Sequence, residues 1–175
     1  MRSIVLILAI FFVQGCVTNQ RTHKLASTFD SKEASFIFAS GKNEIKGSAL
    51  VRQAGGGIVT CAGSKISLVP RTSYADERMA VLYGTTSDSG SILGLINTTF
   101  DGDSTEYLNH MKESVCDAQG FFSFKNVADG TYYIIASIWW RLPNSNPFVN
   151  QQSGANMMRR VEAKGGQVVE VVLSP

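Results

Sequence analysis

Apolar and polar residues alternate along most of the chain from residue 35 onward, in short runs separated by Gly, Pro, Asn and Asp. A period of two places successive side chains on opposite faces of a β-strand, and the separating residues are typical of turns. Strands are expected over residues 35–39, 45–53, 65–69, 112–116, 120–124, 131–140, 157–163 and 168–173. Short strands separated by turns predict an all-β sandwich of about seven to eight strands.

The segment 131–140 is apolar on nearly both of its faces. One face carries Tyr132, Ile134, Ala136, Ile138 and Trp140, and the other carries Tyr133, Ile135, Ser137 and Trp139. Because both faces need cover, this strand is expected at the centre of a sheet. The last segment, 168–173, suits a strand covered on one side, and Gly165 and Gly166 are expected to form a hairpin turn before it.

The composition agrees with one globular domain. Hydrophobic residues make up 44% of the 175 residues and charged residues 17%, below the average of about 25% charged residues, which excludes disorder, coiled coils and long solvated helices. Sixteen Lys and Arg against fourteen Asp and Glu leave a net charge of +2, and the densest basic run is Arg159-Arg160. A nucleic-acid partner is therefore excluded, because that function needs a basic surface.

The first residues have the pattern of an export signal. A single cation precedes ten apolar residues, Ile4–Val13, which are too few for a membrane-spanning helix of about 20 residues. The run ends in Val13-Gln14-Gly15-Cys16, which resembles the lipobox of bacterial lipoproteins. This resemblance implies a signal peptide over residues 1–15, lipid attachment to Cys16 and, because Val17 follows instead of Asp, delivery to the outer membrane of a Gram-negative bacterium.

An uncleaved membrane anchor and an ordinary signal peptide are the alternatives to the lipobox. Residues 16–34 are polar and aperiodic, which predicts a flexible tether between the anchor and a β-sandwich domain over residues 35–175.

The cysteine count agrees with export. If Cys16 carries lipid, Cys61 and Cys116 are left as a pair. Exported cysteine pairs are usually oxidised, so a disulfide between these two residues is expected. The alternative is two buried thiols that pack as small apolar side chains.

The segment Gly120–Ala136 reads GFFSFKNVADGTYYIIA and resembles the signature of carboxypeptidase regulatory-like domains. In that family, a glycine turn precedes two aromatic residues spaced by one, and a second turn ending in Gly precedes Thr-Tyr and an apolar strand. The resemblance implies a transthyretin-like sandwich. Residues 71–111 form an insertion relative to the usual pattern, with either a short helix or an irregular strand over residues 74–83.

Catalytic chemistry finds little support in the sequence. His110 and Glu113 have the H-x-x-E spacing seen in zinc carboxypeptidases, but a zinc site needs a third ligand and the other histidine, His23, belongs to the tether. A strand over residues 112–116 would also send His110 and Glu113 to opposite faces. His110 lacks the G-x-S-x-G context of a serine nucleophile. No catalytic residue, metal or cofactor is predicted, and a hydrolase is a remote alternative.

The segment Trp139-Trp140-Arg141 is the candidate binding site, because adjacent strand residues point to opposite faces. The favoured interpretation is that both tryptophans are buried, one on each face. The alternative is an exposed tryptophan that stacks, with Arg141 beside it, on a sugar ring or a peptide aromatic group. Polar residues over 144–152 follow and offer amide groups for carbohydrate binding.

These observations favour a non-catalytic, membrane-anchored lipoprotein whose β-sandwich mediates interactions or structural support at the cell envelope. Recognition of an envelope glycan or peptidoglycan through the aromatic segment is the second hypothesis. The expected partners are the membrane, reached through the lipid, and an envelope protein or glycan.

Overall fold

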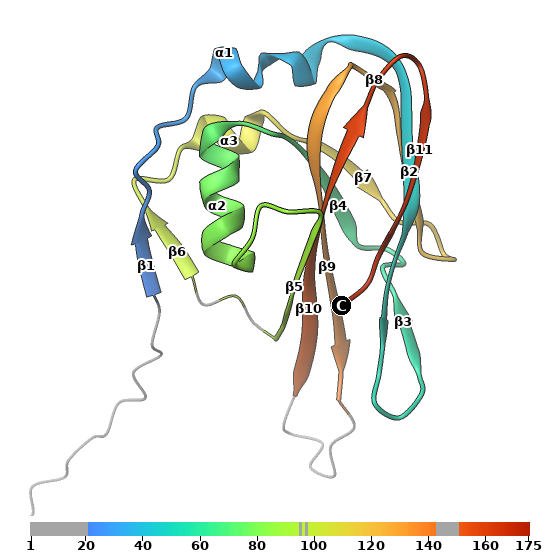
Figure 1. Ribbon diagram of the computed structural model, residues 1–175. Helices are drawn as coiled ribbons and strands as arrows, with labels where there is room; N and C mark the ends of the chain where they lie inside the picture. Colours follow the sequence, from blue (N-terminus) through green and yellow to red (C-terminus); the bar gives the residue numbers. More distant parts are fainter. Residues whose placement is uncertain (1–20, 95, 97, 143–150) are drawn as a thin grey trace, which may run out of the picture.

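Two β-sheets pack face to face in the computed structural model, which describes residues 21–94, 96, 98–142 and 151–175 (Figure 1). The first sheet has the order β5 (Ser89–Leu93), β10 (Gln152–Ala163), β9 (Gly130–Arg141), β4 (Lys65–Pro70) and β7 (Lys112–Val115). In the second sheet, β2 (Ser40–Arg52) pairs with β11 (Val168–Leu173), β8 (Phe121–Val127) and β3 (Ile58–Thr60). The described chain is an all-β sandwich, as expected, with nine strands in these two sheets.

The main core lies between the two sheets and is built around β9. This strand lies between β10 and β4, which confirms its predicted central place. Its inward residues Tyr132, Ile134 and Ile138 are buried. They belong to one apolar cluster with Ile45 of β2 and Phe122 of β8. Removal of this surface from water is the main stabilising contribution to the sandwich.

A helix covers the outer face of the first sheet, so that the molecule has a third layer (Figure 1). Helix α2 (Ser73–Tyr83) begins after Thr72, whose Oγ1 accepts a hydrogen bond of 3.1 Å from the backbone N–H of Ala75, and it ends at Gly84 in the left-handed conformation. Of the two structures considered for residues 74–83, the helix is thus the one that forms. The second apolar core, beneath α2, contains Val69, Tyr74, Ala75, Met79, Tyr107, Tyr133 and Met158.

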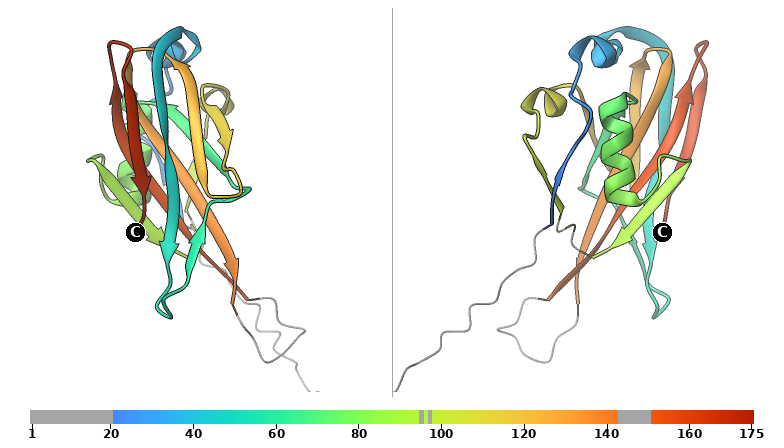
Figure 2. Two further views of the ribbon diagram at one scale, coloured as in Figure 1. Left: turned by 90° about the vertical axis from the view of Figure 1, so that its right-hand side faces the viewer. Right: turned by 60° about the vertical axis from the view of Figure 1, so that its left-hand side comes forward.

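The expectation of a flexible tether over residues 16–34 is wrong from residue 21 onward. Residues 21–38 form an ordered segment, here called the strap, that runs past α2 (Figure 2). It contains β1 (Arg21–Lys24), which pairs in parallel with β6 (Thr98–Asp101), helix α1 (Ser31–Ala34) and the 3₁₀ helix η1 (Ser35–Phe38). The strand expected over residues 35–39 is therefore also wrong. Residues 16–20 lie outside the described residues.

The strap is ordered because α2 supplies hydrogen-bond acceptors that its polar sequence needs. Glu77 of α2 accepts hydrogen bonds from the N–H groups of Ala26 and Ser27 at 2.7 and 2.8 Å and from the Ser27 hydroxyl at 2.5 Å. Phe29 packs edge-on against Tyr74 and Tyr107 of the second core. The residues that contact the strap are far from it in sequence. The composition of the strap and its lack of periodicity therefore could not predict these contacts.

The connection between the last two strands also differs from the prediction. Strand β11 pairs in parallel with β2 and leaves the sheet of β10, so Gly165 and Gly166 form a turn between sheets instead of a hairpin. Both glycines have positive φ angles, of 68° and 78°. The buried Asn43 holds the turn, because its Oδ1 accepts hydrogen bonds from Gly166 N at 2.8 Å and Gln167 N at 3.0 Å. Helix α3 (Thr105–Asn109) completes the described elements.

Candidate functional site

The two adjacent tryptophans of β9 lie in different environments. Trp140 points inward with Ile138 and packs, half-buried, against the main core. Trp139 points to the opposite face and keeps 41% of its surface exposed. The expectation that both rings are buried is thus wrong for Trp139, because α2 covers only part of the outer face of the first sheet.

A glycine on the neighbouring strand positions the indole of Trp139. Gly154 of β10 is its partner in the sheet register. A Cβ atom placed on Gly154 would lie 2.3 Å from Cε3 of Trp139 and 2.5 Å from Cζ3, so the ring covers the bare backbone of this residue. The indole packs on β10 on one side and is exposed to solvent on its outer side.

Polar side chains lie along the same face as Trp139. Arg141 lies two residues further along β9, and Gln152 is its partner on β10. Both residues are exposed. We call the residues Trp139, Arg141, Gln152 and Gly154 the indole platform. A flat aromatic ring beside a guanidinium and a carboxamide can stack on an apolar ring face and donate hydrogen bonds to hydroxyl groups around it.

Hydrogen bonds beside the indole platform fix the chain near Gly94. The Ser137 hydroxyl donates to Oδ1 of Asn156 at 2.7 Å, and Nδ2 of Asn156 donates to the carbonyl of Gly94 at 3.1 Å. Gly94 N donates to the carbonyl of Gly154 at 2.8 Å. These bonds connect β9, β10 and the end of β5 directly beside Trp139. Residues 144–150 of the predicted polar loop lie outside the described residues.

A groove of about 690 Å³ runs over the outer face of the second sheet. We call it the Phe121 groove. The sequence did not predict it, because the alternation over residues 121–124 does not show whether the outer face of the strand is covered. Phe122 and Phe124 are indeed buried, whereas Phe121 points outward and is 57% exposed. The groove is lined by Lys46, Gly47, Ser48, Ser114, Val115, Asp117, Phe121, Phe122, Ser123, Glu170, Val171 and Val172.

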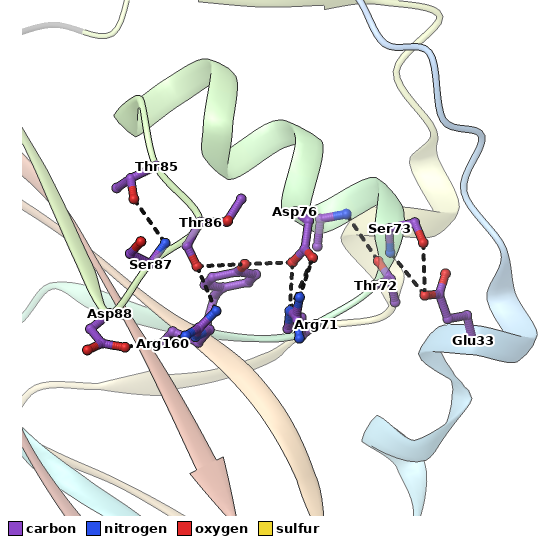
Figure 3. Close-up of polar contacts among 12 residues, drawn as sticks. Glu33, Arg71, Thr72, Ser73, Asp76, Thr85, Thr86, Ser87, Asp88 and Arg160 are labelled. Carbon is purple, nitrogen blue, oxygen red and sulfur yellow. Dashed lines mark hydrogen bonds and ion pairs between the residues drawn. The ribbon is translucent and has the colours of Figure 1, made fainter.

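Another polar cluster lies at the start of α2 (Figure 3). Two smaller cavities, of about 410 and 330 Å³, are lined by its residues. The single Nε–H of Arg71 is shared between both oxygens of the Asp76 carboxylate, at 3.0 and 3.1 Å, and Nη2 donates to the same carboxylate at 2.8 Å. The Tyr133 hydroxyl also donates to Asp76, at 2.6 Å. Burial and this bond raise the pKa of Tyr133 to about 12.

The charged groups of this cluster are bonded within the fold. Besides the Arg71–Asp76 pair, Ser73 N at the start of α2 donates to Glu33 of the strap at 3.0 Å. Arg160 of β10 donates to the carbonyl of Thr86 at 3.0 Å. The cluster therefore fastens α2 to the strap and to the first sheet, and we assign it a structural role.

The predicted disulfide is present. Cys61 and Cys116 are bonded, with their Cα atoms 5.8 Å apart and both residues buried. Cys61 directly follows β3 of the second sheet, and Cys116 directly follows β7 of the first sheet. The bond therefore links the two sheets. Cys16, the predicted lipid acceptor, lies outside the described residues.

His110 and Glu113 do not form one site. His110 follows α3, where its Nδ1 lies 2.8 Å from the carbonyl oxygen of Glu106 and its ring packs against Phe29 and Phe38. Glu113 lies on β7 and pairs with Lys65 at 2.7 Å. In the described ranges, no three His, Cys, Asp or Glu residues gather where they could hold a metal ion. Likewise, the described part of the chain has no helix with the length and apolar character needed to span a membrane.

Comparison of the sequence with known protein families and with curated proteins gives no match. The structure is similar to the crystal structure of a "putative carbohydrate binding protein" from Pseudomonas aeruginosa. The two structures align with a TM-score of 0.68 over 85% of this chain and 99% of the other, with 21% sequence identity. At this identity, the similarity establishes a common fold.

Proposed function

We propose that this protein is a non-catalytic carbohydrate-binding module of the bacterial cell envelope and that the indole platform is its binding surface. The observation that carries the proposal is the position of Trp139, whose ring packs on Gly154 and stays exposed on its outer side. The name of the Pseudomonas protein with the same fold supports the choice of ligand class.

The chemistry of the indole platform suits a sugar. The C–H groups on one face of a pyranose ring form an apolar patch that stacks on an indole, while the hydroxyls at its edge need polar partners. The guanidinium of Arg141 supplies donors, and the carboxamide of Gln152 supplies both donors and an acceptor. Because the ring is held by the sheet, little conformational freedom is lost on binding.

The proposal includes the position of the protein in the cell. We propose that Cys16 carries the lipid and holds the module at the outer membrane, which the lipobox-like sequence before it supports. A non-catalytic role is supported by the separate partners of His110 and Glu113. Kinship with carboxypeptidase regulatory-like domains remains part of the proposal. It is supported by the segment Gly120–Ala136, which forms β8, a turn and the first half of β9.

Affinity electrophoresis in gels that contain single envelope polysaccharides, including solubilised peptidoglycan, tests the binding function. We expect at least one polysaccharide to retard the protein. Trp139→Ala should weaken this retardation at least about tenfold, the size expected for a central aromatic contact. The unfolding temperature should change little, because the ring is partly exposed.

Phe38→Ala is the matched control, since Phe38 is an aromatic residue on η1 that is 61% exposed. This variant should migrate like the wild type. Equal retardation of Trp139→Ala and the wild type, or no retardation by any of the polysaccharides, would show that the proposed function is wrong.

A further inference from the structure

We propose that the Phe121 groove is a second, separate binding site, which takes a segment of an uncharged oligosaccharide. Its volume of about 690 Å³ lies within the range of roughly 300–1,000 Å³ that is usual for small-molecule sites. The proposal depends on the lining of this groove and not on Trp139. Each of the two proposed sites can therefore be confirmed or refuted independently of the other.

The groove and the indole platform lie on opposite faces of the sandwich. Lys46, Ser123 and Glu170 alternate along their strands with residues of the main core, so they point outward from the second sheet. Trp139 points outward from the first sheet, because its neighbours Ile138 and Trp140 belong to that same core. These side chains of the groove and the indole platform therefore lie on opposite sides of the main core, and the groove also reaches Ser114 and Val115 of β7, the edge strand of the first sheet farthest from β10 and β5.

The apolar part of the groove is an aromatic ring with aliphatic flanks. Phe121 at the start of β8 is 57% exposed, and Val115 and Val172 are each 60% exposed. Val115 comes from the end of β7 and Val172 from β11, so apolar side chains line the groove from three strands. An exposed phenyl ring between hydroxyl-bearing residues is the arrangement that a sugar ring needs, with apolar stacking and polar edges.

Polar side chains of the groove are held in place by bonds within the protein. Lys46 and Glu170 form an ion pair of 3.0 Å across β2 and β11. Ser123 donates a hydrogen bond of 2.8 Å to Glu44. The Glu170 carboxylate, which lines the groove, keeps further lone pairs for sugar hydroxyls, because a carboxylate can accept about four hydrogen bonds. Such preorganisation lowers the entropy that binding loses.

The charges of the lining disfavour an acidic ligand. Lys46 is the cation among the lining residues, and it is paired with Glu170, while Asp117 adds a further negative charge. An anionic polymer would be repelled by this balance, whereas a neutral saccharide needs no compensating charge.

The backbone groups at the first residue of β8 are already paired. Phe121 N donates to Oδ1 of Asp117 at 2.8 Å, and the Phe121 carbonyl accepts from Asp117 N at 2.8 Å. These bonds disfavour the pairing of an added peptide strand at Phe121, since such a strand would bind through backbone groups.

Titration calorimetry of the detergent-extracted full chain tests the proposal with cellohexaose, maltohexaose and chitohexaose as neutral probes and hexagalacturonate as the acidic probe. We expect at least one neutral hexasaccharide to bind. Phe121→Ala should weaken this binding at least about tenfold, and Phe121→Trp should restore it. Phe38→Ala, the truncation of an equally exposed phenyl ring outside the groove, should have no effect.

Trp139→Ala separates this proposal from the function proposed above. Neutral binding that survives Trp139→Ala and is lost in Phe121→Ala supports the groove. Loss in Trp139→Ala with full retention in Phe121→Ala would refute the groove and leave the indole platform as the site. Equal or tighter binding of hexagalacturonate, or no binding of any neutral probe, would also refute the proposal.

Discussion

The orientation of the Trp139 ring depends on Gly154, a residue that no sequence pattern connects with it. Gly154 lies beside Trp139 in the sheet register and has no side chain, so the indole can lie directly on the β10 backbone. A larger residue at this place would lift the ring away from the sheet. The orientation of the indole platform is thus set by a pair of residues on neighbouring strands.

Gly154→Ala tests this pair. The added methyl group would meet the indole at 2.3 Å, so the ring must move. We expect a loss of about 1–3 kcal/mol in the free energy of unfolding, as for an overpacked contact, and a changed fluorescence spectrum of Trp139. Gly55→Ala is the control, because a Cβ atom there meets nothing within 4 Å. Equal stability of the two variants would contradict the close contact.

At this scale the sequence predicted which side chains share a face and which do not. The alternation over 131–140 placed Trp139 and Trp140 on opposite faces, and the structure agrees. Exposure could not be predicted, because it depends on where α2 ends above the sheet. Phe121 shows the same limit, since an aromatic residue at the start of a strand does not reveal which of its faces is covered.

At the scale of elements, the strap illustrates how polar contacts can order a segment without an apolar period. Three donors of Ala26 and Ser27 converge on the carboxylate of Glu77. The Ser27 hydroxyl, followed by the backbone N–H groups of Ala26 and Ser27, lowers the pKa of Glu77 below its ordinary value. The strap should therefore be held most firmly when Glu77 is ionised.

This linkage predicts a pH-dependent stability. A carboxylate whose pKa is lowered by folding stabilises the fold above its unfolded pKa of about 4.3, and the contribution is lost as the pH falls through the folded pKa. The difference in unfolding free energy between the wild type and Glu77→Gln should be constant above about pH 5 and shrink in more acidic solution. Ser27→Ala should show a smaller difference with the same trend. A difference that does not change with pH would contradict the assignment.

The sequence predicted some strands to within one residue, but the two long strands β2 and β10 each begin five residues earlier than expected. The runs now seen as β4, β9 and β11 have strong alternation or many β-branched residues, and their expected bounds differ from the observed ones by at most one residue. Strand β5 lies in a stretch rich in Ser and Gly, where no strand was expected. It forms because it pairs with β10, whose residues lie more than sixty positions away in sequence.

At the scale of the whole molecule, a disulfide bond joins the two sheets. The Cys61–Cys116 disulfide connects the end of β3 with the end of β7 across 55 residues of sequence. Such a bond restricts the unfolded chain more than the folded one. Its residue Cys116 lies in sequence between Val115 and Asp117, which both line the Phe121 groove.

Removal of both cysteines tests this contribution. For a loop of this length, the Cys61→Ala/Cys116→Ala double variant should lose about 4 kcal/mol of unfolding free energy in the loop-closure description. Urea unfolding of the oxidised wild type and the variant gives the difference. A change below about 1 kcal/mol would show that the unfolded chain is restricted by other means.

The sheet topology was the least predictable feature at this scale. Two glycines after an alternating strand usually indicate a hairpin, yet β11 crosses to β2 and pairs with it in parallel. Asn43 stabilises this connection, because its Oδ1 accepts hydrogen bonds from Gly166 N and Gln167 N, more than 120 positions away in sequence. A contact between residues so far apart cannot be predicted from local sequence patterns.

The central claim is that Trp139 contacts a sugar while Trp140 supports the core. The chain has two tryptophans, so its indole N–H groups give two NMR signals, which a Trp139→Phe variant assigns. A titration of the full chain with a polysaccharide that retards it in affinity electrophoresis should shift the Trp139 signal and leave the Trp140 signal in place. An unmoved Trp139 signal at saturating polysaccharide would contradict the account.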